Sequence, residues 1–163
     1  MKCVAAVGMT VLVMVLASAD AFAQTAPAQA PGAAVPQALT YEMALQVMDA
    51  AEAEARKNKW NVTIVVTDAA GVPVVLRRLT GASPRSYDIA TRKAATVVAT
   101  KLTTAIYGEQ LKAGSVKEVP NGITFAGGVP IMRGSEFIGA VGTSGVRAIE
   151  DEQISKAGAS VIK

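Results

Sequence analysis

The chain has 163 residues, of which 51% are hydrophobic and 4% aromatic, and its formal net charge is +3. That length accommodates one ordinary domain and a tail but is too short for two domains. The small, scattered basic excess and the scarcity of aromatic residues argue against nucleic-acid binding. The sequence has no histidine and a single cysteine, Cys3. These gaps exclude a catalytic triad, a Cys–His dyad and a histidine-ligated metal or haem.

The first 23 residues have the layout of a secretory signal peptide. A short positive start precedes an apolar stretch at residues 4–18, and Ala-Phe-Ala at residues 21–23 forms a cleavage signal before Gln24. The apolar stretch of about 15 residues is shorter than the roughly 20 that span a bilayer, which disfavours a membrane anchor. We therefore expect export to the periplasm or the medium. Cleavage near Ala23 would remove Cys3, so the mature protein would use no disulfides.

Residues 24–38 are rich in alanine, proline and glutamine and carry no charge. This composition is typical of a flexible linker. The expected organisation is therefore a signal peptide at 1–23, a linker at 24–38 and one domain at 39–163. A domain of about 120 residues can bury one core.

Helical and strand patterns alternate along the domain. Thr40 is a candidate N-cap, and the apolar residues that follow it recur at helical spacing. Turn signals at residues 68–71 and at Gly134-Ser135 each separate two strand patterns. Pro73 cannot donate to a ladder, so it belongs at the start of a strand or on an edge. The expected elements are a helix after Thr40, strands at 62–66 and 72–79, helices at 83–100 and 103–112, strands at 123–126, 129–133 and 136–141, and a final helix ending near 162.

This order, α-ββ-αα-βββ-α, predicts an α/β (α+β) domain. Strands joined by tight turns pair antiparallel, so we expect one antiparallel sheet of about five strands with helices packed on it. The glycine-rich segments 127–130 and 139–145 lack the spacing of a phosphate loop. Their glycines are more consistent with close packing against a helix or a neighbouring subunit.

Five short motifs occur in order along the domain. They are residues 65–71, Arg78 with Gly81-Ala82, residues 88–90 with Lys93-Ala94, residues 127–131, and residues 139–145 followed by Asp151-Glu152. In this combination they resemble the GlcG/HbpS-like (DUF336-type) family of small haem-binding and corrinoid-associated proteins, from Leu39 to the C-terminus. The resemblance implies a profilin-like domain that assembles into homo-oligomers, and haem binding in some exported members.

The resemblance also implies a haem site centred on the second predicted helix. It points to Thr96 near the iron and to Arg78 and Lys93 near the propionates. Tyr87 and Tyr107 are further candidates, because methionine and tyrosine are the only usual haem ligands that the mature chain would keep. Each candidate also has a structural explanation: a hydrogen bond within the helix for the threonine, packing for the tyrosines and solvated charge for the basic residues.

Basic residues are concentrated in the second predicted strand and the helix after it, where arginines can bind carboxylates in bidentate fashion. Neighbouring strand residues point to opposite faces, so only one of Arg77 and Arg78 can face a given pocket. Asp49 and Glu52, three residues apart on the first helix, are weak candidates for a surface metal ion, and a solvated acidic face is the favoured explanation. The basic set is Arg77, Arg78, Arg85, Arg92 and Lys93.

Together these observations favour an exported haem-binding protein that acts in haem or redox sensing or in haem handling. The expected partners are haem or a related tetrapyrrole, further copies of the chain and a membrane sensor. Two alternatives stay open: a module that binds a corrinoid or another small metabolite, and a small enzyme using carboxylate or lysine chemistry. For the enzyme, the candidate groups Asp68, Asp88, Lys93 and Lys101 show no spacing that demands catalysis.

Overall fold

The structure is a computed structural model that describes residues 38–163. The predicted signal peptide (1–23) and all but the last residue of the predicted linker (24–38) lie outside the described residues. Among residues 38–163, none of the helices is long and apolar enough to span a bilayer. The elements are α1 (Tyr41–Lys57), β1 (Thr63–Asp68), β2 (Pro73–Arg78), α2 (Arg85–Thr100), α3 (Thr104–Lys112), β3 (Gly128–Arg133), β4 (Glu136–Ser144) and α4 (Ala148–Ala159).

The four strands form one antiparallel sheet in the order β2-β1-β4-β3. The predicted α+β architecture, with helices packed on an antiparallel sheet, is confirmed. The Gly134-Ser135 turn joins β3 to β4, and Gly134 takes the positive φ of +58° that this turn favours in glycine. The predicted cap of α1 is also present, because the Thr40 side chain accepts a hydrogen bond from the Met43 N–H.

The prediction of about five strands is wrong by one strand. Residues 123–126 are irregular, so the observed order is α-ββ-αα-ββ-α. The N–H of Ile123 donates to the Thr96 side chain instead of joining a ladder. Gly127 then takes a φ of +125°, which turns the chain before β3 begins. The last helix ends at Ala159, before the predicted residue 162.

The two outer strands of the sheet both contain a proline. Pro73 is the first residue of β2, which confirms its predicted place at the start of an edge strand. Pro130 lies within β3, opposite Ala140 of β4. A proline has no N–H to donate, so both residues occupy the sheet positions that tolerate proline.

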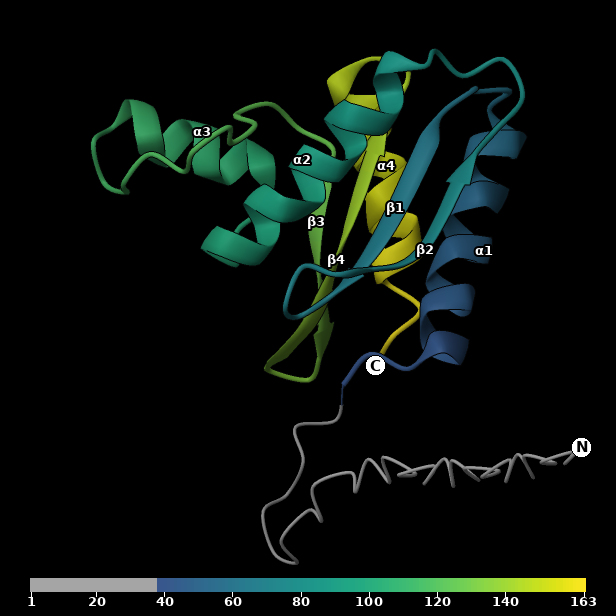
Figure 1. Ribbon diagram of the computed structural model, residues 1–163, viewed down its shortest axis with the longest axis horizontal. Helices are drawn as coiled ribbons and strands as arrows, with labels where there is room; N and C mark the ends of the chain where they lie inside the picture. The colour runs from purple at the N-terminus through teal and green to yellow at the C-terminus, as the bar shows by residue number, and fades with distance from the viewer. Residues whose placement is uncertain (1–37) are drawn as a thin grey trace, which may run out of the picture. The chain divides into compact units, whose positions relative to one another are not determined.

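Helices cover both faces of the sheet (Figure 1). Val141 of β4 joins the main core, which lies between the sheet and the pair α1 and α4. Its neighbour Ala140 points to the other face and packs with α2 in a smaller cluster. Helix α3 follows α2 and contacts it beside β3. The core of α1 is the set predicted from its spacing: Ala44, Val47, Met48, Ala51 and Ala55.

The contact between α2 and the sheet depends on Gly142 of β4. A Cβ atom built on Gly142 would lie 2.1 Å from the backbone oxygen of Ala90 and 2.8 Å from the backbone nitrogen of Ala94. Both of those atoms belong to the backbone of α2, which cannot move as a side chain can. Gly142 therefore sets how closely α2 approaches β4.

Replacing Gly142 with alanine should push α2 away from the sheet. We expect Gly142→Ala to lower the free energy of unfolding by about 3 kcal/mol, the upper range for overpacking a close contact. Denaturant unfolding followed by circular dichroism measures this change. Gly134→Asn is the matched control: that turn position is open and asparagine tolerates its positive φ, so its stability should stay within about 0.5 kcal/mol of the parent. Equal stability of Gly142→Ala and the parent would contradict this account.

Candidate functional site

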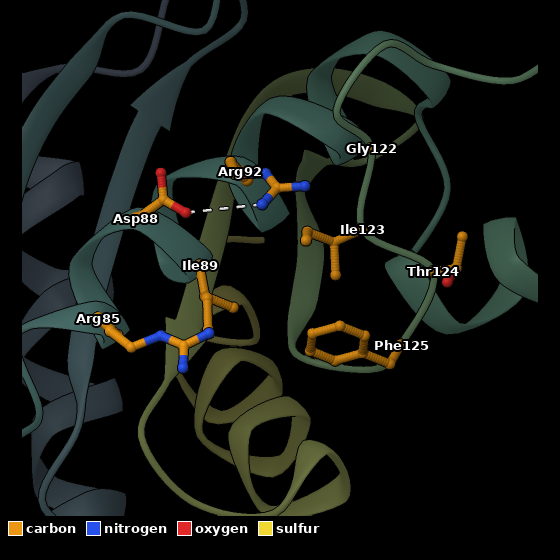
Figure 2. Close-up of a pocket in the computed structure, with 8 residues that line it drawn as sticks. All are labelled: Arg85, Asp88, Ile89, Arg92, Gly122, Ile123, Thr124 and Phe125. Carbon is orange, nitrogen blue, oxygen red and sulfur yellow. Dashed lines mark ion pairs between the residues drawn. The ribbon is translucent and has the colours of Figure 1, made fainter.

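A cavity of about 420 Å³ opens between α2 and residues 122–125. This volume falls within the range of small-molecule sites. Figure 2 shows arginine side chains from α2 at this cavity and the ring of Phe125 across from them. Carbon atoms of Ile89, Ile123 and Phe125 supply apolar wall. The complete lining is Arg85, Asp88, Ile89, Arg92, Gly122, Ile123, Thr124 and Phe125.

The charged side chains of the cavity come from successive turns of α2. Arg85, Asp88 and Arg92 share one side of the helix with Ile89, because residues three, four and seven positions apart lie on one face. Asp88 and Arg92 form an ion pair of 3.6 Å across one turn; the Asp88 side chain is largely exposed and the Arg92 side chain is partly exposed. Among residues 38–163, the Arg85 side chain makes no ion pair or hydrogen bond. The cavity therefore combines two guanidinium groups and one carboxylate with apolar walls.

Two side chains of α2 fix the opposite wall of the cavity. The buried Thr96 hydroxyl accepts from the Ile123 N–H at 2.9 Å and donates to the Arg92 carbonyl at 2.8 Å. The Arg92 Nε donates to the Asn121 carbonyl at 3.0 Å. Further back, the buried Tyr107 hydroxyl accepts from the Val119 N–H at 2.8 Å. An irregular segment is thus held against α2 by side-chain hydrogen bonds in place of a ladder.

A buried ion pair lies beneath this wall. Lys93 of α2 is completely buried, and its Nζ donates to the Asp151 carboxylate of α4 and to the Thr143 carbonyl of β4, both at 2.8 Å. The Phe125 ring centroid is 5.0 Å from the same Nζ, a cation–π distance. Asp151 also accepts from the Val146 N–H at 3.2 Å. One ammonium group therefore joins α2, β4, α4 and the cavity wall.

Burial controls how this pair titrates. Removal from water lowers the pKa of Lys93, and the attraction of Asp151 opposes that effect. The same removal from water raises the pKa of Asp151, and Lys93 opposes it in turn. For both groups desolvation is the larger effect, because a charge is costly where water is excluded.

Gly127 leaves room for the ammonium group. A Cβ atom on this residue would lie 2.3 Å from the Lys93 Nζ. The Gly127 carbonyl accepts from the Ser155 hydroxyl at 2.8 Å, and that hydroxyl also lies 2.8 Å from the Thr143 hydroxyl. The glycine-rich segment 127–130 is expected to pack closely against a helix, and Gly127 packs against the Lys93 side chain of α2.

None of the five residues predicted to contact haem lines this cavity. Thr96 and Lys93 lie behind the cavity, and neither lines it. Tyr107 is buried on α3, where it binds the backbone of Val119. Tyr87 is 53% exposed and outside the cavity lining. Arg78 is exposed at the end of β2, also outside the lining.

The acidic pair on α1 is occupied by an arginine. Arg77 Nη1 lies 2.6 Å from an Asp49 oxygen and 2.7 Å from a Glu52 oxygen. Within residues 38–163, no group of three or more potential metal ligands comes together. Because Arg77 points to α1, strand alternation directs Arg78 to the other face, as predicted. The two carboxylates therefore neutralise Arg77 in this structure.

Sequence reasoning named Arg85 and Arg92 but preferred Arg78, and it did not identify Ile89, Ile123 or Phe125. The spacing of Arg85, Ile89 and Arg92 was the available signal, since it places all three on one face of α2. Asp151 is part of the last family motif, but the sequence assigns it no role in a site. Its pairing with Lys93 links residues 58 positions apart, which no local pattern reveals.

Comparison with known proteins identifies the relatives of this chain. Residues 39–160 match the family model described as "Haem degrading protein HbpS-like". The chain belongs to the HbpS-like family. Protein GlcG of Escherichia coli K12 is 35% identical over 108 residues, which cover 65% of this chain and 81% of GlcG. The sequence-based resemblance is thereby confirmed.

Solved structures with the same fold include HbpS itself. A double mutant of Streptomyces reticuli HbpS superposes with a TM-score of 0.73 at 34% identity, covering 85% of this chain and 98% of HbpS. A structure described as a PduOC:heme complex superposes with a TM-score of 0.65 at 27% identity, covering 77% of this chain and 96% of the other. The matched parts of this chain therefore cover nearly the whole of both solved chains.

The Lys93–Asp151 pair should be costly to break from one side only. We expect Lys93→Met to lower the free energy of unfolding by about 3–5 kcal/mol, because it leaves an unpaired buried carboxylate. Lys93→Met/Asp151→Asn should recover at least half of that loss, since the amide oxygen can still accept from the Val146 N–H. Denaturant unfolding of the parent and both variants measures the difference. A double variant as unstable as the single one would contradict this role of the pair.

The double variant should also change how stability depends on pH. Raising the pKa of Asp151 favours the folded state below the ordinary value of 3.8, and this contribution is lost as pH rises through the raised pKa. Lowering the pKa of Lys93 favours the folded state above 10.5, and this contribution is lost as pH falls through the lowered pKa. The free energy of unfolding of the double variant, measured relative to that of the parent, should therefore be highest near neutral pH. A pH series of unfolding curves tests the sign.

Proposed function

We propose that this chain binds haem in the cavity between α2 and residues 122–125. The observation that carries the proposal is the pairing of two guanidinium groups, Arg85 and Arg92, with the apolar wall formed by Ile89, Ile123 and Phe125. Membership of the HbpS-like family and likeness to the structure described as a PduOC:heme complex support the same ligand.

The cavity side chains fit the organic parts of haem. Arg85 and Arg92 would hold the propionates, because a guanidinium binds a carboxylate through two parallel hydrogen bonds. Ile89, Ile123 and Phe125 would cover the apolar ring and exclude water from it. Bound haem would supply a redox-active iron at the surface of the domain. The residues present therefore fit the group through its ring and its carboxylates.

Three of the residues predicted to contact haem are assigned a different part in this proposal. Thr96 and Tyr107 hold the backbone that forms the far wall, through Ile123 and Val119 respectively. Lys93 supports Phe125 from beneath. All three are buried, so they position the wall and do not contact the ligand. Arg78 and Tyr87 lie outside the cavity, where a second copy of the chain would have to bring them to the ligand.

We also propose that the protein is exported. The apolar stretch and the cleavage signal at residues 4–23 support delivery to the periplasm or the medium, where the protein would sense or handle haem. Self-association and a membrane sensor as partner stay predictions from the sequence.

Haemin titration of the protein tests the proposed site. The parent should give a saturable Soret shift. Arg85→Ala should weaken haemin binding roughly five- to thirtyfold, because it removes one partly exposed charged hydrogen bond. Arg92→Ala should weaken binding at least as much, since this arginine also holds the Asn121 carbonyl.

Arg56→Ala is the matched control. It removes the same charge from α1, on the face of the sheet opposite α2, and should leave the haemin affinity unchanged. Circular dichroism spectra of all variants show that they are folded. Parent-like titrations for Arg85→Ala and Arg92→Ala would place haem elsewhere, and a parent without a saturable shift would refute haem binding.

The mature N-terminus should be Gln24 if the protein is exported. Cleavage after the Ala-Phe-Ala signal removes residues 1–23 and with them the only cysteine. Intact-mass measurement of protein isolated from the cell envelope or the medium checks this expectation. A chain that keeps Met1, or one that is found only inside the cell, would contradict it.

A further inference from the structure

The side chains of the cavity are suited to bind the carboxylates and the ring of a tetrapyrrole more than its metal. Arg85 and Arg92 are its two cationic groups, and both suit carboxylates. Ile89, Ile123 and Phe125 offer carbon to the ring faces. None of these five side chains is a usual haem-iron ligand, so the contacts they would supply do not depend on the metal.

The lining offers an iron only two side-chain donors. The Thr124 hydroxyl is a neutral oxygen ligand, and the Asp88 carboxylate is already paired with Arg92 at 3.6 Å. Strong haem ligation in proteins uses histidine, thiolate, methionine or tyrosinate. None of those side chains belongs to the cavity lining. Tyr107, the tyrosine behind the far wall, is fully buried with its hydroxyl bound to the Val119 N–H.

Resting on the proposed haem site, we propose that this cavity recognises porphyrin dicarboxylates as a class, whether or not they carry iron. Affinity then comes from two charge-assisted carboxylate contacts and from burial of the ring. Metal-free protoporphyrin IX and zinc protoporphyrin retain both features. Their dissociation constants should lie within about tenfold of that of haemin, a difference of about 1.4 kcal/mol.

The decisive comparison uses three porphyrins with the same ring. Protoporphyrin IX is followed by its fluorescence, haemin by its Soret band, and protoporphyrin IX dimethyl ester tests the carboxylates. All titrations use the parent protein in one buffer, with enough mild detergent to keep the porphyrins monomeric. Protoporphyrin IX (the diacid) and haemin should bind with similar affinity. The dimethyl ester (the diester) should bind at least about tenfold more weakly.

Arg85→Ala separates carboxylate recognition from a general loss of binding. This variant should weaken haemin and protoporphyrin IX by the same factor, within about threefold, and should leave the diester unaffected, because an ester offers no carboxylate to lose. Arg56→Ala should leave all three ligands at parent affinity. If Arg85→Ala weakens binding of the diester as strongly as binding of the diacid, the arginine shapes the cavity and does not bind the carboxylate.

The outcomes for the two proposals are distinct. If haemin binds but protoporphyrin IX binds more than about a hundredfold more weakly, iron ligation dominates. The proposed haem-binding function then stands and the metal-independent recognition is overturned. If neither porphyrin binds saturably, the proposed function itself fails. Equal binding of diester and diacid would also overturn this inference.

Discussion

The fold is organised around one buried ammonium group, that of Lys93. Three elements distant in sequence meet at its Nζ: α2 supplies the lysine, β4 the Thr143 carbonyl and α4 the Asp151 carboxylate. Such a pair contributes little net stability, because the loss of water nearly offsets the attraction between the charges. Its structural effect is on geometry, since it fixes α2 against the sheet at a position where helix α4 starts.

The cavity wall depends on this arrangement. Residues 122–125 belong to no strand, so their position comes from Thr96, Arg92 and the Phe125 ring above the ammonium. All three contacts lead back to α2, which also carries the charged side of the cavity. One helix thus determines both the position of the wall and the groups that face it. Displacing α2 would alter the ligand site as a whole.

Local patterns in the sequence specify most of this fold. The periodic apolar residues of α1, the Thr40 cap and the Gly134-Ser135 turn predict their elements, and the strand pattern at residues 62–66 predicts β1. The false strand at 123–126 has a clear cause: its apolar residues satisfy cavity and core contacts, while the Ile123 N–H binds a threonine side chain. A hydropathy pattern does not reveal that a backbone N–H binds a side chain and not a neighbouring strand.

The candidate site was only partly accessible to sequence reasoning for the same reason. Family motifs drew attention to Lys93 and Thr96, and both are central, but as buried supports. The motif at Asp151 and the motif at Lys93 describe two halves of one contact across 58 positions. Only the three-dimensional arrangement distinguishes a residue that touches a ligand from one that holds the wall behind it.

The prolines of the outer strands have a consequence for how copies of this domain can assemble. A sheet grows from one molecule into the next only if its outermost strand presents an unbroken series of backbone donors. Pro73 interrupts that series on β2 and Pro130 interrupts it on β3. Fibre-like stacking through the sheet is therefore hindered at both ends. Any contact between copies would then have to use helices and loops in place of strand edges.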